Sequence, residues 1–122
     1  MSAFANLGTV GPQDIWNAVR VRAIHGERIT LGVVELDPNV AVPEHSHDTE
    51  QLGIVVSGSL TFRIGDESRE LAAGGMYSIP ANVPHEVITT GPEGAVVIDV
   101  FAPIRADWSR FEPQAPREPR WP

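Results

Sequence analysis

The chain of 122 residues contains no cysteine and no lysine. Without cysteine it can form no disulfide, so its core must hold the fold, and the composition fits a reducing compartment. No segment approaches the roughly 18 consecutive apolar residues of a membrane-spanning helix. Residues 1–13 contain no basic residue and no apolar run of signal-peptide length, so we expect a cytoplasmic protein.

All nine basic residues are arginines, and sixteen acidic residues give a formal net charge of −7. This balance disfavours nucleic acid and anionic membranes as partners. Hydrophobic residues make up 42% of the chain, and a chain of this length commonly forms one domain. We expect a single domain over residues 1–111, including an N-terminal segment, and a Pro-rich tail over residues 112–122.

Apolar and polar residues alternate in short segments, a pattern typical of β-strands. The expected strands cover residues 18–23, 29–33, 40–45, 51–57, 60–64, 76–79, 85–89 and 95–101, with glycine and proline between them. Such a series predicts an all-β antiparallel sandwich or small barrel. Only residues 12–17 are compatible with a helical turn. The tail favours polyproline II, and we expect it to be loose or packed along a neighbouring subunit.

Three of the four histidines form the main candidate site. His45 and His47 are one residue apart in an extended segment, so their imidazoles share a face with Cα atoms about 6.6 Å apart, close enough to bind one ion. His85 begins a later strand. Gln51 and Glu50 are alternative fourth ligands, and a regular strand turns Gln51 inward and Glu50 outward, which favours Gln51. We predict one divalent transition metal ion per chain: zinc, nickel, iron or manganese.

The amide of Gln51 affects the chemistry expected of such a site. Three neutral imidazoles and a neutral amide leave the full double charge on a bound ion, whereas a carboxylate would partly cancel it. This favours Lewis-acid chemistry on water or a substrate oxygen. Oxygen activation at Fe(II) commonly uses a carboxylate ligand, so the amide disfavours a dioxygenase.

The spacing of these residues resembles the paired motifs of the cupin superfamily. The motifs here are His45-x-His47-x3-Gln51-x6-Gly58 and Gly74-x5-Pro80-x4-His85. The resemblance covers about residues 28–101 and departs from the family where its usual glutamate ligand is replaced by Gln51. It implies a small antiparallel jelly-roll (cupin) barrel that holds a single metal ion.

Asp99 interrupts the apolar segment 95–102, where a lone carboxylate is costly to bury without a partner. Alternation places Val97, Asp99 and Phe101 on one face, which lines the cavity in a small barrel. Asp99 is therefore either a structural residue bonded to a ligand histidine or a buried amide, or a general acid/base. Arg105, just past the strand, could bind a carboxylate in bidentate fashion.

A second resemblance is to the pectin-degradation cupins that act on unsaturated uronates. It is carried by His45-Ser-His47-x3-Gln51, by Val55-Val56-Ser57-Gly58, and by the segment Ile98 to Trp108. Those proteins convert 4,5-unsaturated monouronates into linear 5-keto-4-deoxyuronate. The similarity implies metal ligands at His45, His47, Gln51 and His85, catalytic residues Asp99 and Arg105, and substrate binding by Phe101 and Arg105.

These observations predict a metal-dependent isomerase or hydrolyase that acts on a small carboxylate-bearing substrate, a sugar acid. One alternative is an iron-dependent dioxygenase that acts on a small organic molecule. Another is a non-catalytic cupin that binds a metal or small ligand. Because jelly rolls leave sheet edges and an apolar outer face, we also expect a homodimer that the N-terminal segment and the tail help to form.

Overall fold

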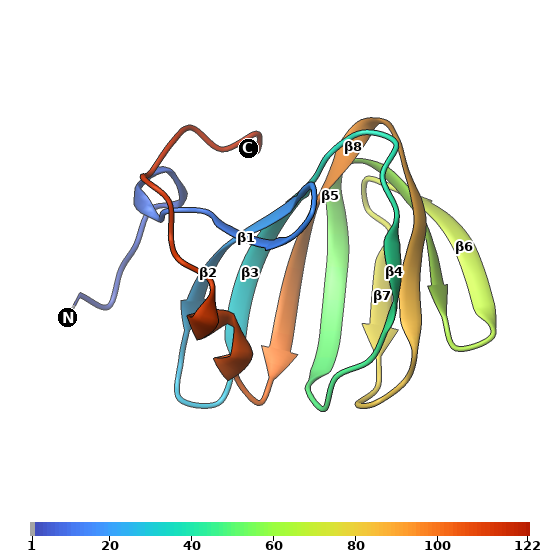
Figure 1. The fold of residues 1–122 in the computed structure, drawn as a ribbon, viewed down its shortest axis with the longest axis horizontal. Helices are drawn as coiled ribbons and strands as arrows, with labels where there is room; N and C mark the ends of the chain where they lie inside the picture. Colours follow the sequence, from blue (N-terminus) through green and yellow to red (C-terminus); the bar gives the residue numbers. More distant parts are fainter. Residues whose placement is uncertain (1) are drawn as a thin grey trace.

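The computed structural model describes residues 2–122, and its regular elements are almost all strands (Figure 1). The strands are β1 (Gln13–Trp16), β2 (Val19–His25), β3 (Thr30–Leu36), β4 (Val42–His45), β5 (Glu50–Ile64), β6 (Glu67–Ala72), β7 (Met76–Ile79) and β8 (His85–Ala102), with short 3-10 helices η1 (Leu7–Thr9) and η2 (Ala106–Arg110). The eight strands form one sheet in the order β1-β2-β3-β8-β5-β6. In addition, β4 pairs with β8, and β7 pairs with β5. All pairs are antiparallel. Within residues 2–122 no helix is long and apolar enough to cross a membrane.

The two longest strands, β5 and β8, join the two halves of the barrel. The first half of β5 pairs with the second half of β8, and the second half of β5 pairs with the first half of β8. Register shifts near the middle of β5 bend this ladder. Gly58 and Gly94 meet at the bend, both with positive φ, and a Cβ on Gly58 would overlap the carbonyl of Gly94. The glycines that separate expected strands in the sequence thus bend continuous strands in the structure.

Two elements differ from the sequence-based expectation. Residues 13–16 form strand β1 instead of a helical turn, because β2 pairs with one side of it. The side-chain amide of Gln13 donates to the carbonyls of Trp108 and Phe111, which joins β1 to the segment around η2. Strand β6 was not expected, because nearly all of its residues are exposed and its sequence shows no apolar alternation.

The tail, residues 112–122, lies on its own chain beside β2 and β3, where the sequence suggested a loose segment or one packed on a neighbour. Arg22 and Glu35 form a buried ion pair across these strands, with 2.8 Å between Nη1 and Oε2. The tail completes this pair, because the Arg120 amide donates to Glu35 and the Arg117 carbonyl accepts from Arg22. Burial by itself would raise the pKa of Glu35, but Arg120 and Arg22 outweigh it and lower the pKa.

We expect Glu35→Ala to lower the free energy of unfolding by about 3–5 kcal/mol, because it leaves Arg22 buried without its carboxylate. Urea denaturation at neutral pH measures this effect. Since folding lowers the pKa of Glu35, its contribution is present above the unfolded pKa and is lost as the pH falls through the folded pKa. Glu67→Ala, at an exposed position of β6, is the matched control, and equal stability of the two variants would contradict this account.

Candidate metal centre and active site

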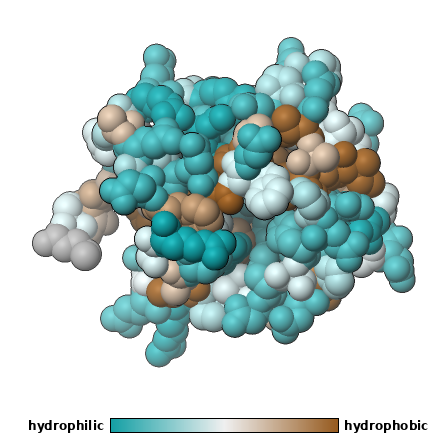
Figure 2. All heavy atoms as spheres, viewed as in Figure 1, coloured by the Kyte–Doolittle hydropathy of each residue, from teal (hydrophilic) through white to brown (hydrophobic). Residues whose placement is uncertain are grey.

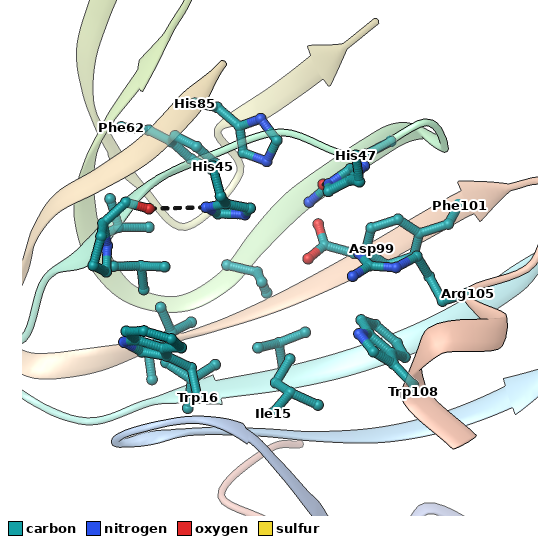
Figure 3. A pocket seen from close by; sticks show the side chains of 18 of the residues that line it. Ile15, Trp16, His45, His47, Phe62, His85, Asp99, Phe101, Arg105 and Trp108 are labelled. Carbon is teal, nitrogen blue, oxygen red and sulfur yellow. Dashed lines mark hydrogen bonds between the residues drawn. The ribbon is translucent and has the colours of Figure 1, made fainter. Parts of the chain in front are cut away.

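A cavity of about 390 Å³ enters the barrel and is lined by residues of β1, β2, β3, β4, β5, β7 and β8 and of the segment around η2. All of the site residues expected from the sequence line it: His45, His47, Gln51, His85, Asp99, Phe101 and Arg105. Figure 3 shows the three histidines on one side of the cavity, with Ile15, Trp16 and Trp108 on the opposite side. The structure therefore brings residues from distant parts of the sequence to one place.

The three histidines come from the end of β4, the loop after it and the start of β8. His45 is paired with His85 in the sheet, and His47 follows His45 by two residues. One ring nitrogen from each lies within 4.8 Å of the others. This cluster could hold a metal ion.

Hydrogen bonds determine which ring nitrogen faces the cluster. Each Nδ1 lies 2.8–2.9 Å from a backbone carbonyl: Pro43 for His45, Thr49 for His47 and Val83 for His85; the first is dashed in Figure 3. An Nδ1–H that donates to a carbonyl leaves the lone pair on Nε2. In the described chain, Nε2 of His85 is buried and has no hydrogen-bond partner. A bound metal ion would satisfy this atom, so the cluster fits the metal that the fold implies.

The electrostatics of the cluster favour neutral imidazoles, the form that binds metals. Burial lowers the pKa of His85 to about 4, and the positive charges of His45, His47 and Arg105 add to the effect. Burial also lowers the pKa of His47, together with the charge of Arg105. Both rings are therefore deprotonated and ready to act as ligands at neutral pH.

Gln51 is buried in the cavity wall, whereas Glu50 is exposed. The amide oxygen of Gln51 lies 3.1 Å from Nε2 of His47, so it borders the histidine cluster. The same amide hydrogen bonds to Asp99 and lowers the pKa of that carboxyl. A glutamate here would place a second carboxylate beside Asp99, which gives a physical reason for an amide at this position. The ligand role of Gln51 stays a prediction.

Asp99 is buried on β8, and the hydroxyl of Tyr77 donates a hydrogen bond of 2.5 Å to its Oδ1. Burial raises the pKa of Asp99 to about 6, although the hydrogen bonds from Tyr77 and Gln51 act in the opposite direction. A carboxyl with such a pKa can both take up and release a proton near neutral pH. Gly53 provides the space for this pair, because a Cβ there would overlap both Asp99 and Tyr77.

Tyr77 was not singled out from the sequence, although it is the only tyrosine of the chain. It lies within the expected strand 76–79, and alternation with Ile79 would have turned it inward. The sequence gives no sign that its hydroxyl meets Asp99, because β7 and β8 are both neighbours of β5 and do not pair with each other.

If ionised Asp99 is the base, Tyr77→Phe is expected to move the acid limb of the kcat/KM profile to higher pH. The hydrogen bond from Tyr77 lowers the pKa of Asp99, so its loss raises that pKa, and less of the base is ionised at a given acidic pH. The rate should fall most on the acid side of the profile. Met76→Leu, at an exposed position of the same strand, should leave the limb unchanged. An unmoved limb in Tyr77→Phe would contradict this role.

Arg105 is less free than the sequence suggested. Its guanidinium carbon lies 4.8 Å and 4.6 Å from the ring centroids of Phe101 and Trp108. Its Nε and Nη2 both donate to Asp107, each at 3.0 Å. Asp107 therefore occupies the edge of the guanidinium formed by Nε and Nη2. A substrate carboxylate would have to bind through Nη1 or share the guanidinium with Asp107.

Comparison with known proteins gives this fold and site a family. The family model described as "Cupin domain" matches residues 32–101, more than half of the chain. The chain therefore belongs to the cupin family. The matched range contains the three histidines, Gln51 and Asp99, whereas β1, Arg105 and η2 lie outside it.

Two curated proteins resemble the chain over about half its length. One is the pectin degradation protein KdgF of Dickeya dadantii (strain 3937), 40% identical over 65 residues, which are 52% of this chain and 58% of that protein. The other is H2HPP isomerase of Bacillus subtilis, 36% identical over 64 residues, 52% of this chain and 27% of that protein. The chain thus matches less than two thirds of the length of each relative.

Solved structures confirm the expected jelly-roll cupin fold. An RmlC-like cupin from Shewanella frigidimarina NCIMB 400 superposes with a TM-score of 0.81 at 22% identity, over 88% of this chain and 96% of that one. KdgF from Halomonas sp. superposes with a TM-score of 0.79 at 24% identity, over 88% and 98% of the two chains.

Proposed function

We propose that the chain is a metal-dependent enzyme. It would move a proton from one atom to another of a small carboxylate-bearing substrate bound in this cavity. The observation that carries the proposal is the buried carboxyl of Asp99, which lies in the same cavity as three histidines whose ring nitrogens lie within 4.8 Å of one another. An ion held there by the histidines and Gln51 would supply Lewis-acid stabilisation of negative charge on substrate oxygens. The acid–base group and the metal centre would then act on the same molecule.

The first substrate proposed is a 4,5-unsaturated monouronate, converted to linear 5-keto-4-deoxyuronate. The resemblance to the pectin degradation protein KdgF supports this choice. In this isomerisation the bond from C1 to the ring oxygen breaks, the C1 hydroxyl loses its proton to give an aldehyde, C4 gains a proton and C5 becomes a ketone. Asp99 would take and return the proton, and Arg105 would hold the carboxylate.

Proton NMR of the 4,5-unsaturated monouronate tests the proposal, because the vinylic H4 signal disappears as the keto product forms. With metal-loaded protein we expect the H4 signal to disappear faster than without protein. After a chelator removes the metal, the signal should disappear no faster than in the uncatalysed reaction. Oxygen uptake that requires Fe(II) would instead indicate a dioxygenase. Tight ligand binding without turnover would indicate a non-catalytic cupin.

We also propose that the chain forms a homodimer through the outer face of its sheet. Leu31, Leu52, Met76 and Val100 are exposed there. Leu31 and Leu52 both pair with Val100, so the apolar side chains continue across β3, β8 and β5. An exposed apolar surface of several adjacent strands is typical of a protein interface. A second copy presents the same uncharged side chains, so the face can pair with itself about a two-fold axis.

The double variant Leu52→Arg/Met76→Arg is expected to be a monomer in sedimentation experiments at micromolar concentration, where the unmodified protein is a dimer. In a dimer, the two arginines of each chain would be buried against the arginines of the other chain, with no acidic side chain to pair with. Glu67→Arg, exposed on β6, is the control and should stay dimeric. An unmodified protein that sediments as a monomer would refute the dimer.

A further inference from the structure

Arg63 of β5 joins the two strands that carry His45 and His85. Its Nε donates to Glu86 at 2.8 Å, and its Nη2 donates to Glu44 at 3.0 Å. Glu44 precedes His45 on β4, and Glu86 follows His85 on β8. One guanidinium therefore binds the chain beside two of the three clustered histidines. We call Glu44, Arg63 and Glu86 the ion triad.

The register of the sheet places the ion triad beside the histidines. Arg63 pairs with Glu86 across β5 and β8, and the next pair along these strands contains His85. His85 is in turn paired with His45 of β4. Phe62 and His85 line the cavity. Because side chains alternate between the two faces of a strand, their neighbours Arg63 and Glu86 point away from it.

Strand β4 has few other attachments. It is four residues long, none of its side chains is buried, and among the described strands it pairs only with β8. Its pairing is irregular between Val42 and His45. The Nδ1 of His45 bonds to Pro43 of the same strand, so this bond orients the ring without attaching the strand. The ion pair between Arg63 and Glu44 is a second attachment of β4, in this case to β5.

The guanidinium of Arg63 is held more firmly than that of an exposed arginine. The face of the molecule drawn in Figure 2 is largely hydrophilic, and charged side chains on such a surface are mostly solvated. Only 27% of the Arg63 side chain is exposed, and its third donor, Nη1, binds the carbonyl of Gly65 at 2.8 Å. The amide of Gly65 in turn donates to the carbonyl of Pro84, the residue before His85. The ion triad is therefore tied to the segment that leads to His85.

Arg63 also offsets a repulsion between like charges. Because His45 and His85 are paired, Glu44 and Glu86 are neighbours across β4 and β8. Carboxylates at such positions repel each other and destabilise the strand pair. Arg63 forms an ion pair with both of them, so its loss would leave two negative charges between the strands that carry the histidines.

We propose that Arg63 is a positioning residue of the metal centre, which holds β4 against β8 so that His45 stays beside His85 before the ion binds. The proposal rests on the proposed function for the metal ion alone. Without Arg63 the two carboxylates would separate the strands, and part of the free energy of metal binding would be used to bring His45 back. Charge alone predicts the opposite effect, because the loss of a cation near the site favours a bound metal ion.

Competition for zinc between the full chain and a chromophoric chelator tests this role, because it measures the dissociation constant without any turnover. Arg63→Met should bind zinc about threefold or more weakly than the unmodified chain. Arg69→Met, which removes an exposed ion pair on β6, is the matched control and should bind zinc as the unmodified chain does. Equal or tighter binding in Arg63→Met would overturn the proposal.

A second substitution separates positioning from a general loss of stability. In Arg63→Met/Glu44→Gln one of the two facing carboxylates is neutral, so the strands no longer repel each other and zinc affinity should recover toward that of the unmodified chain. A general loss of stability, or a direct effect of charge on the ion, would make the double variant bind zinc no better than Arg63→Met. That result would overturn the proposal.

The zinc measurement is independent of the uronate assay. Equal zinc affinity in Arg63→Met and the unmodified chain would overturn the positioning role and leave the proposed function standing. An unmodified chain that binds none of zinc, nickel, iron and manganese would overturn the metal centre and the role of Arg63 with it. Weaker zinc binding in Arg63→Met, without uronate turnover by the unmodified chain, would support the positioning role and refute the uronate as substrate.

Discussion

His85→Ala is expected to reduce bound metal from about one ion per chain to nearly none, and to abolish turnover. His85 is the most deeply buried of the three histidines, and its Nδ1 is held by Val83, so Nε2 has one direction in which to bind. Its removal leaves two imidazoles and an amide oxygen, and because the amide is a poor donor this set binds a transition metal weakly. Elemental analysis of the purified variant measures the loss.

His25→Ala is the matched control, because His25 is exposed at the end of β2 and does not line the cavity. Gln51→Ala should weaken metal binding less than the loss of a histidine, since an amide oxygen is the poorest donor of the four. Full occupancy after the loss of both His45 and His47 would refute the metal site. Loss of metal in Glu50→Ala but not in Gln51→Ala would show that the fourth ligand has been assigned wrongly.

Asp99→Asn is expected to lower turnover by about 100-fold or more while metal content stays unchanged. The substitution keeps the shape of the side chain and an oxygen that can accept the Tyr77 hydrogen bond, but it removes the group that takes up the proton. Rate and metal content should be measured on the same preparation.

The structural alternative for Asp99 predicts a different result. If Asp99 acts by orienting the metal site through Gln51, the asparagine variant should lose metal affinity by roughly 10–100-fold, and added metal should restore its rate. Rescue by metal would therefore remove Asp99 from the catalytic residues.

The barrel and the placement of the site residues could be predicted because both depend on local periodicity. Alternation along β8 determines that Val97, Asp99 and Phe101 face inward together. His45 and His47 also line the cavity together, although His47 lies in the loop after β4. His85 lies far from His45 and His47 in the sequence, so local periodicity does not predict that the three meet. It was assigned through the second motif, in which the spacing of Gly74, Pro80 and His85 resembles that of a known family.

Other features depend on contacts between segments far apart in the sequence, which no local pattern reveals. β1 is a strand because its backbone pairs with β2, and the side chain of Gln13 joins it to the carbonyls of Trp108 and Phe111. The tail is ordered by a buried ion pair on β2 and β3. Arg105 was correctly placed at the cavity, but its pairing with Asp107 reduces the freedom expected of it.

Anomalous diffraction from crystals of the metal-loaded protein tests the central claim most directly. We expect one anomalous peak per chain, about 2.0–2.2 Å from Nε2 of His45, His47 and His85 and from the amide oxygen of Gln51. A peak bound through Nδ1, a peak elsewhere in the molecule, or no peak after soaking with zinc, nickel, iron and manganese in turn would contradict the account.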